Sequence, residues 1–249
     1  PGRSGHKQAI KTALEVESVR SLTAKLFCTT PENIIFTLNC TDALNLAILG
    51  SFKPGGHVVC TVNEHNSVLR PLEHLKNCDP SFSYTVAQST GKLGVTWQDI
   101  EKCLTDETYM VVCNHISNVN GDVADIVDIG NHLKEKNILF LVDGAQGGGH
   151  FHYNMKEMDI NMLALAPHKG FYAPQGVGVL ALNGNFDLEP IRFGGTGTNS
   201  LELFQPDSTP EKFESGTINT PAILGFGEGL KFVEENFDYI QAKLEDLVT

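Results

Sequence analysis

The sequence has few cations and no long apolar run, and these two absences exclude several classes of protein. Its 249 residues include 18 Lys and Arg against 30 Asp and Glu, which gives a formal net charge of −12. Nucleic acids and anionic membranes attract clustered cations, and the cations here are scattered, so neither partner is expected. No run reaches the roughly 20 apolar residues that cross a bilayer. The 41% apolar and 19% charged content instead indicates a chain with a buried core.

Cysteine pairs with metal-site or disulfide spacing are also missing. The six cysteines are spread along the chain without a C-x-x-C pair, and most fall in apolar runs. His150 and His152 have strand spacing, but no cysteine or carboxylate pattern accompanies them. We therefore expect no metal site, mostly buried reduced thiols and a reducing compartment. No targeting signal is visible from Pro1 onward, and we expect a cytoplasmic protein.

Apolar runs and helical patterns alternate along the chain, which predicts an α/β fold. Several runs are apolar throughout, as strands buried on both faces are. The alternation implies crossover connections, so we predict a seven-stranded, mostly parallel sheet with flanking helices. The predicted strands are residues 34–37, 58–61, 82–86, 109–115, 138–143, 162–166 and 176–182. The predicted helices are residues 6–27, 41–49, 67–76, 97–104 and 126–136.

The pattern changes after residue 186. Residues 186–217 lose periodicity and are rich in Gly, Pro, Thr and Ser, which predicts a long functional loop or hinge. A last helix is predicted from Pro221 to about residue 246, with nothing within the chain to pack against. We therefore divide the chain into a large domain, 1–217, and a connecting helix with the start of a C-terminal domain, 218–249.

Polar side chains follow five of the predicted strands. In an open α/β sheet, ligands bind beyond the carboxyl ends of the strands. Those positions hold residues 39–42, 64–67, 115–118, 143–146 and 167–170. Polar groups at so many strand ends indicate a functional site.

Two charged residues at these ends allow specific chemistry or an ordinary structural role. Lys169 follows an apolar strand, where desolvation lowers an amine's pKa and suits it to Schiff-base chemistry with an aldehyde. The alternative is a lysine that extends into solvent. Asp143 ends the most apolar strand and needs a cationic partner. That partner is an arginine, a helix N-terminus or a protonated pyridine nitrogen.

The neutral residues allow two interpretations as well. Thr41 lies where a strand gives way to a helix, so it either caps that helix or helps its free N–H groups to bind a phosphate. His65 either satisfies a turn or lies flat on an aromatic ring. Asn118 and Gln146 carry amides that can bind a phenolic oxygen without titrating.

Together these residues resemble the class V aminotransferase family of pyridoxal 5′-phosphate (PLP) enzymes, and within it the cysteine desulfurase group. The matching segments occur in family order over nearly the whole chain, so the series is specific although no single segment is decisive. They are GRSGH (2–6), IIFTLNCTDALNLAILG (34–50), NEHNSVLRPLEHL (63–75), NHISNVNGDV (114–123), LVDGAQGGG (141–149), HKGFYAPQGVGVL (168–180), FGGTGTNS (193–200) and FESGTINTPAILGFGEGL (213–230).

The resemblance implies PLP as the cofactor and assigns catalytic and ring-binding roles. Lys169 would form the Schiff base with the cofactor aldehyde. Asp143 would pair with the ring nitrogen, Gln146 would bind the ring oxygen and His65 would stack on the ring. Asn118 would lie near the face on which the substrate binds.

The resemblance also assigns a phosphate site and a dimer. Cys40, Thr41 and His168 would hold the phosphate within one subunit. Thr217 would reach the phosphate of the neighbouring subunit, which implies a homodimer. Relatives often carry Ser or Thr two residues before the His-Lys pair, and Ala166 stands there instead.

The implied activity is removal of sulfur from L-cysteine or a similar amino acid, giving alanine and an enzyme persulfide that a sulfur-acceptor protein could discharge. In desulfurases a small C-terminal domain supplies the nucleophilic cysteine and a carboxylate-binding arginine, and none of the six cysteines here holds such a position. We therefore expect the chain to be the cofactor domain of a longer protein. The alternatives are another class V PLP enzyme, either an aminotransferase or a selenocysteine lyase, and an inactive scaffold that keeps the fold.

Overall fold

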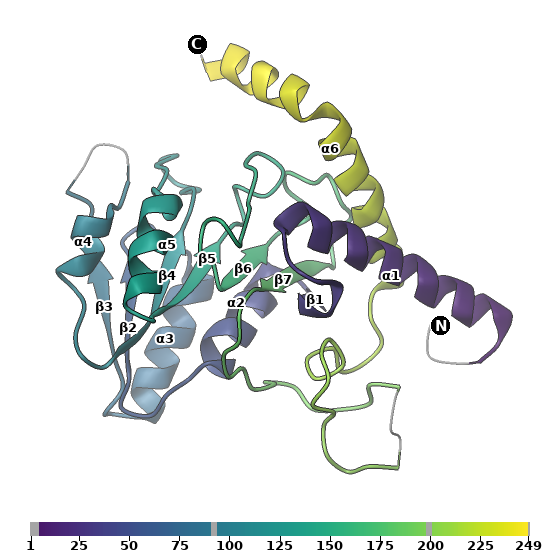
Figure 1. Cartoon of the computed structure of the whole chain (residues 1–249), viewed down its shortest axis with the longest axis horizontal. Helices are drawn as coiled ribbons and strands as arrows, with labels where there is room; N and C mark the ends of the chain where they lie inside the picture. The colour runs from purple at the N-terminus through teal and green to yellow at the C-terminus, as the bar shows by residue number, and fades with distance from the viewer. Residues whose placement is uncertain (1–4, 91–93, 198–200, 249) are drawn as a thin grey trace.

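The computed structural model describes residues 5–90, 94–197 and 201–248, and its centre is a sheet with helices on both faces (Figure 1). All seven predicted strands form, and their ends move by at most two residues. They are β1 (Ile34–Thr37), β2 (His57–Thr61), β3 (Ser83–Ala87), β4 (Thr108–Asn114), β5 (Leu139–Asp143), β6 (Met162–Leu165) and β7 (Gly178–Leu182).

The predicted helices form as well. They are α1 (Lys7–Phe27), α2 (Cys40–Gly50), α3 (Asn66–Cys78), α4 (Trp97–Glu101), α5 (Ile126–Glu135) and α6 (Thr220–Val248), with a short 3₁₀ turn at Pro31–Asn33. Helix α4 ends earlier than predicted, although Thr96 and Asp99 form a capping box at its start. Polar side chains of Asn39 and His65 cap α2 and α3.

The sheet is mostly parallel, as predicted. Its strand order is β1-β7-β6-β5-β4-β2-β3, and β7 alone runs antiparallel to both of its neighbours. The other four pairings are parallel, and Asn114 of β4 lies beside Asp143 of β5 in register. The carboxyl ends of the parallel strands therefore meet at one edge of the sheet.

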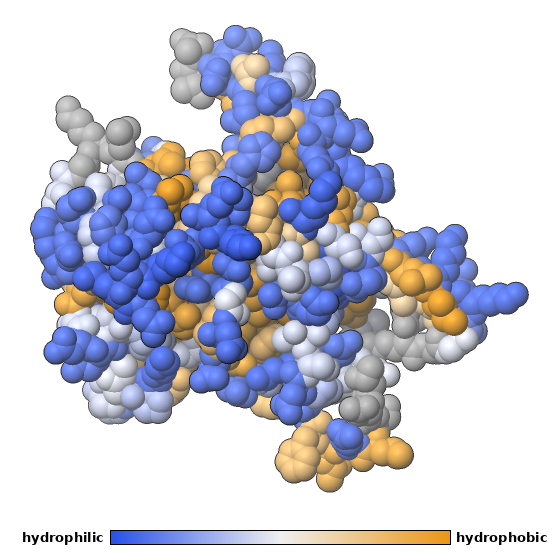
Figure 2. Space-filling view, in the orientation of Figure 1, coloured by the Kyte–Doolittle hydropathy of each residue, from blue (hydrophilic) through white to orange (hydrophobic). Residues whose placement is uncertain are grey.

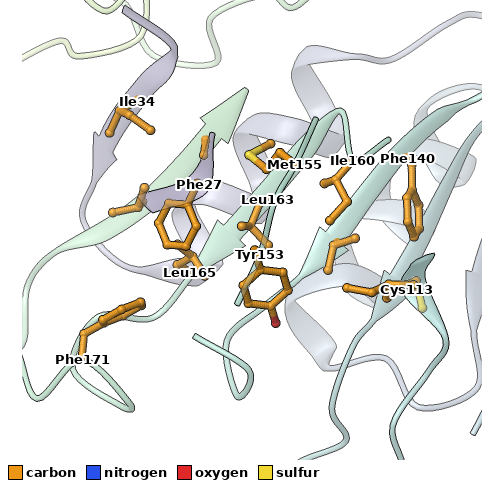
Figure 3. Packing of buried hydrophobic residues seen from close by; sticks show 14 of the residues in the cluster. Phe27, Ile34, Cys113, Phe140, Tyr153, Met155, Ile160, Leu163, Leu165 and Phe171 are labelled. Carbon is orange, nitrogen blue, oxygen red and sulfur yellow. The ribbon is translucent and has the colours of Figure 1, made fainter. Parts of the chain in front are cut away.

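Alternate residues of the strands pack into two separate cores. Ile34 and Phe36 face the layer formed by α1, α4, α5 and α6, whereas Ile35 faces α2 and α3. Figure 3 shows the first of these cores, in which the rings of Phe27 and Tyr153 lie 6.4 Å apart, edge to face. Burial on both faces explains why the central strands, such as β6 and β7, are apolar throughout, whereas the edge strand β3 is largely exposed or half-buried.

The prediction that the last helix has nothing to pack against is wrong. The first half of α6 lies across α1 (Figure 1), and Ile223, Phe226 and Leu230 are buried in the core. At Gly227 the two helices approach so closely that an added Cβ would lie 2.5 Å from Val19. Local periodicity gave the apolar stripe of α6 but not its partner, which is distant in sequence. The domain division at residue 217 stays a prediction.

Helix α6 bends at Asn236, whose backbone angles are not helical. Beyond the bend, the ring of Phe237 lies 3.6 Å from that of His152, and Gln241 donates a hydrogen bond to the carbonyl of His150. The second half of α6 therefore contacts the segment that follows β5.

The thiols are less uniformly buried than predicted. Cys40, Cys60 and Cys113 are buried, but Cys28 is exposed as well as Cys78, because each lies where a helix ends. All six are free. Among the described helices, none is long and apolar enough to cross a membrane. Residues 2–4 and 198–200 of the family-like segments lie outside the described residues.

Candidate functional site

Eight of the nine predicted site residues line one cavity of about 170 Å³ at the carboxyl ends of the strands. They are Cys40, Thr41, His65, Asn118, Asp143, Gln146, His168 and Lys169. Five different strand-to-helix or strand-to-loop connections contribute to this cavity, as the strand-end argument predicts.

Asp143 is the carboxylate of this cavity. Its side chain is buried, and both hydrogen bonds given to it by described residues end on Oδ1, from the Ala145 amide at 2.9 Å and the Cys40 thiol at 3.8 Å. Burial raises the pKa of Asp143, while the Ala145 amide and the nearby charges of Lys169 and His65 lower it. Because no ion pair to Asp143 occurs among the described residues, a cation in the cavity would stabilise the ionised carboxylate.

Close backbone contacts hold the lysine segment against the Asp143 segment. An added Cβ at Gly170 would lie 2.0 Å from the carbonyl oxygen of Gly148. Gly149 has a φ of +85°, and its own added Cβ would lie 2.2 Å from the Gly170 carbonyl oxygen. Only glycines allow two loops to approach this closely. The GGG run after Asp143 and the glycine after Lys169 therefore place the segment that carries Lys169 beside the segment that carries Asp143.

The prediction that Lys169 is desolvated is wrong for this structure. Lys169 and its neighbour His168 are exposed, because the chain leaves β6 at Leu165 and forms a turn at the open side of the cavity. The Lys169 amide donates to the Ala166 carbonyl, and its own carbonyl accepts from Tyr172. Lys169 is thus a residue of this turn and not the last residue of a strand.

The start of α2 forms the opposite wall of the cavity. Asn39 caps the helix by accepting from the Asp42 amide, so Thr41 lies in the first turn and is not itself the cap. The Thr41 hydroxyl lies 2.7 Å from that of Ser67, which in turn lies 2.8 Å from His65 Nδ1. These hydroxyls and the positive end of the α2 dipole form a setting suited to an anion.

The thiol of Cys40 points toward Asp143 and away from this wall. Burial and the Asp143 charge raise the pKa of Cys40 well above its ordinary value. If Cys40 contacts a phosphate, its backbone N–H must do so, since the side chain is turned to the carboxylate.

Sequence reasoning missed three residues of the site. Ser67 and Asn114 line the cavity, and Glu64 is buried directly behind it. Glu64 and Ser67 fall within the strand-end segment 64–67, so their position in the sequence is a signal for the site. Asn114 lies within a largely apolar strand pattern, which gives no such signal. Ala166 stands where relatives often carry a Ser or Thr hydroxyl, and Ser67 supplies a hydroxyl to the same cavity from another segment.

Thr217 is not brought together with the other predicted residues. It lines a separate, smaller cavity together with Phe36, Arg192 and Asn219. A role for Thr217 in the phosphate site of this same subunit is not supported by this placement, and its role in a neighbouring subunit stays a prediction. No cluster of three or more metal-ligating side chains occurs among the described residues.

Comparisons with known proteins agree with this geometry. A family model described as Aminotransferase class-V matches residues 1–249. A probable cysteine desulfurase from Borreliella burgdorferi is 32% identical over 96% of this chain and 60% of its own length. A probable cysteine desulfurase from Pyrococcus abyssi is 31% identical over 99% of this chain and 63% of its own length.

The fold has a counterpart among solved structures. The apo structure of a cysteine desulfurase from Thermococcus onnurineus superposes with a TM-score of 0.87 at 29% identity, over 94% of this chain and 60% of the other. The chain thus spans about 60% of the length of the relatives that it matches.

Proposed function

Because the chain belongs to the class-V aminotransferase family, whose members depend on PLP, we propose that it is the PLP-binding part of a cysteine desulfurase. The observation that carries this proposal is the single cavity in which Lys169 and Asp143 meet. The amine can bond to an aldehyde, and the buried carboxylate can pair with a cationic ring nitrogen.

The described donors and acceptors fit this cofactor in kind and in arrangement. Asp143, the only carboxylate among the described lining residues, has no ion pair among the described residues. The hydroxyls of Thr41 and Ser67 lie at the start of α2, where a phosphate is favoured. Asn118 and Gln146 add neutral amides to the lining of the same cavity.

When bound, PLP supplies an electron sink for negative charge that develops at the substrate Cα. Lys169 Nζ would hold the cofactor through its aldehyde, and the same amine could act as a general base toward the substrate Cα proton. Asp143 would pair with the protonated ring nitrogen, because a buried carboxylate stabilises an adjacent cation. His65 would stack on the ring, and its orientation is set by the hydrogen bond that its Nδ1 accepts from the Ser67 amide at 3.1 Å.

We propose that the thiol that attacks the substrate sulfur comes from outside these 249 residues. Cys40 is the one cysteine among the described lining residues, and its raised pKa keeps it a thiol at neutral pH. The name of the relatives supports L-cysteine as the substrate. An arginine for its carboxylate and a sulfur-acceptor protein belong to the same proposal and rest on the family resemblance alone.

The proposed enzyme is a homodimer in which Thr217 reaches the partner's phosphate site. Supporting this, Phe193, Leu203 and Phe204 are highly exposed on the loop between β7 and α6, an apolar surface that a second subunit could cover. Figure 2 shows apolar atoms at the lower edge of the molecule, over this loop. Sedimentation velocity on the wild-type chain and on Phe204→Ser tests the dimer.

The cofactor assignment is tested by reductive trapping. The chain is mixed with one equivalent of PLP, treated with borohydride and digested, and modified peptides are mapped by mass spectrometry. We expect the modification on Lys169 and its loss in Lys169→Ala, whereas Lys156→Ala, a substitution at an exposed lysine away from the cavity, should not reduce it. Equal trapping in Lys169→Ala would overturn the assignment.

Trapping separates the desulfurase from an inactive scaffold, which would give no specific adduct on Lys169. An aminotransferase or a selenocysteine lyase would give the adduct, and a second measurement, alanine formation from cysteine, separates these enzymes from a desulfurase. The named relatives are desulfurases, so no observation favours these alternatives.

A further inference from the structure

Glu64 is a buried carboxyl group for which the proposed chemistry has no use. It lies one residue before His65, in the turn between β2 and α3, and only 8% of its surface is exposed. Its Oε1 accepts three hydrogen bonds: from the Thr61 hydroxyl at 2.5 Å, from the backbone N–H of Asn114 at 2.7 Å and from the backbone N–H of Thr61 at 3.3 Å. Its Oε2 is buried and has no partner among the described residues.

These bonds join the ends of two neighbouring strands. Thr61 is the last residue of β2, and Asn114 is the last residue of β4. Asn114 reciprocates, because its side-chain amide donates to the Asn63 carbonyl at 2.7 Å. Two consecutive residues of the turn that carries His65, Asn63 and Glu64, therefore form hydrogen bonds with Asn114 at the end of β4. Asn114 also lies beside Asp143 in register on the neighbouring strand β5. The hydrogen bonds of Glu64 therefore connect the His65 turn to the strand pair that carries the cavity carboxylate.

The distribution of hydrogen bonds indicates the charge of Glu64. An ionised carboxylate shares charge over both oxygens, and a buried charged oxygen without a donor is very costly. The titratable groups packed around Glu64 are Asp143 on β5, Cys113 on β4 and Cys60 on β2, and none of them supplies a positive charge. No described lysine, arginine or histidine forms an ion pair with it. The Asp143 charge raises the pKa of Glu64, so ionising both of these buried carboxyls carries a penalty.

We propose that Glu64 is a positioning residue for His65 and for the end of β4, and that it acts as an uncharged carboxylic acid. Because Glu64 is neutral, Asp143 carries the negative charge of the site. This part of the proposal rests on the proposed function, because it matters only where Asp143 faces a cationic ring nitrogen. In agreement, burial raises the pKa of Glu64 to about 8, and the Asp143 charge adds to that rise.

The charge state is tested on the chain without cofactor. A carboxyl whose pKa is about 8 when folded and about 4.5 when unfolded stabilises the fold at low pH, and that contribution is lost as the pH rises through 8. Glu64→Gln keeps an acceptor at Oε1 and cannot ionise. The melting temperature of Glu64→Gln relative to wild type should therefore rise between pH 5 and pH 9, by about 5 °C or more.

Glu157→Gln is the matched control, since it makes the same replacement of a carboxyl group by an amide at an exposed position. Its melting temperature should follow that of the wild type across the same pH range. A difference between Glu64→Gln and wild type that stays constant with pH, or that shrinks as the pH rises, would overturn the assignment of an uncharged acid.

The positioning role is tested by rescue. Glu64→Ala removes the acceptor for Thr61 and Asn114, and we expect PLP to bind at least about tenfold more weakly, read from the absorbance of the bound cofactor at pH 7. Glu64→Gln should bind PLP within about twofold of wild type. A tenfold loss in Glu64→Gln, or no loss in a folded Glu64→Ala, would overturn the role. If the wild type binds no PLP, the proposed function fails, while the melting curves still decide the state of Glu64.

Discussion

Arg20 and Glu214 form a bidentate ion pair in the interior, with Nη1 to Oε1 at 2.9 Å and Nη2 to Oε2 at 3.0 Å. Both side chains are almost fully buried. Glu214 Oε1 also accepts from the Phe36 amide at 2.7 Å, and the guanidinium lies over the Phe36 ring and donates to the Ile34 carbonyl. The pair thus joins α1, β1 and the loop that follows β7.

Replacing Arg20 with Met should destabilise the fold by about 3–5 kcal/mol, because it leaves the Glu214 charge buried without its partner. Urea unfolding followed by circular dichroism measures this. Lys25→Met is the control, since Lys25 forms an exposed pair with Glu234 at 3.8 Å and should change stability by less than about 1 kcal/mol. Adding Glu214→Gln to Arg20→Met should recover part of the loss. Equal effects at Arg20 and Lys25 would contradict the buried pair.

Gly170→Ala should separate the lysine segment from the Asp143 segment. The new Cβ would meet the Gly148 backbone, which cannot rotate away as a side chain can, and the overpacking should destabilise the fold by about 1–3 kcal/mol. We expect the yield of the borohydride adduct on Lys169 to fall in parallel. Gly5→Ala, where an added Cβ meets no atom within 4 Å, should leave both stability and adduct unchanged. An unaltered adduct yield in Gly170→Ala would show that this contact does not position the lysine.

Five of the six cysteines should divide into two classes of reactivity. With iodoacetamide at pH 7, Cys28 and Cys78 should be modified first, because they are exposed. Cys40, Cys60 and Cys113 should react only on unfolding, since burial raises the pKa of each thiol. Time-resolved peptide mapping by mass spectrometry follows the modification of each cysteine.

The same pKa argument predicts that the 249-residue chain forms negligible alanine from cysteine. Alanine is measured with a reductant present, and the chain is compared with a full-length relative such as the probable cysteine desulfurase from Pyrococcus abyssi. Cys40→Ala should keep the Lys169 adduct. Substantial turnover that disappears in Cys40→Ala would make Cys40 the nucleophile and contradict the assignment.

His115 should make stability fall in acid. It is buried, its Nδ1 lies 2.6 Å from Tyr153 Oη, and burial lowers its pKa to about 4. Because the unfolded chain binds the proton more readily, the free energy of unfolding should decrease as the pH falls from 6.5 to 4, by up to about 3 kcal/mol from this group. Urea unfolding at pH 7 and pH 4.5 should show this decrease in wild type and a smaller one in His115→Gln. His74→Gln, at an exposed position, should behave as wild type.

Much of the fold could be predicted from local patterns, because each strand buried on both faces leaves an uninterrupted apolar run. Ligands of an open α/β sheet bind beyond the carboxyl ends of its strands, and this rule located most of the site, since Asp143 and Lys169 lie at or just after the end of such runs. Contacts between distant segments could not be predicted in this way. The packing of α6 on α1, the turn of the Cys40 thiol to Asp143 and the hydrogen bonds from Glu64 to Asn114 depend on the folded arrangement. The periodicity of apolar residues within one segment does not indicate which distant segment those residues will contact.

The place of β7 between β1 and β6 has a consequence for the order in which the described sheet assembles. Ile34 of β1 pairs with Ala181 of β7, and among the described strands β1 has no other neighbour in the sheet. Strands β2 to β6 pair in parallel with one another and can assemble before β7 is in place. Until β7 joins them, the apolar residues of β1 have no strand to pair with. The strand that comes earliest among those described therefore enters the sheet late, through a contact between segments that are distant in sequence.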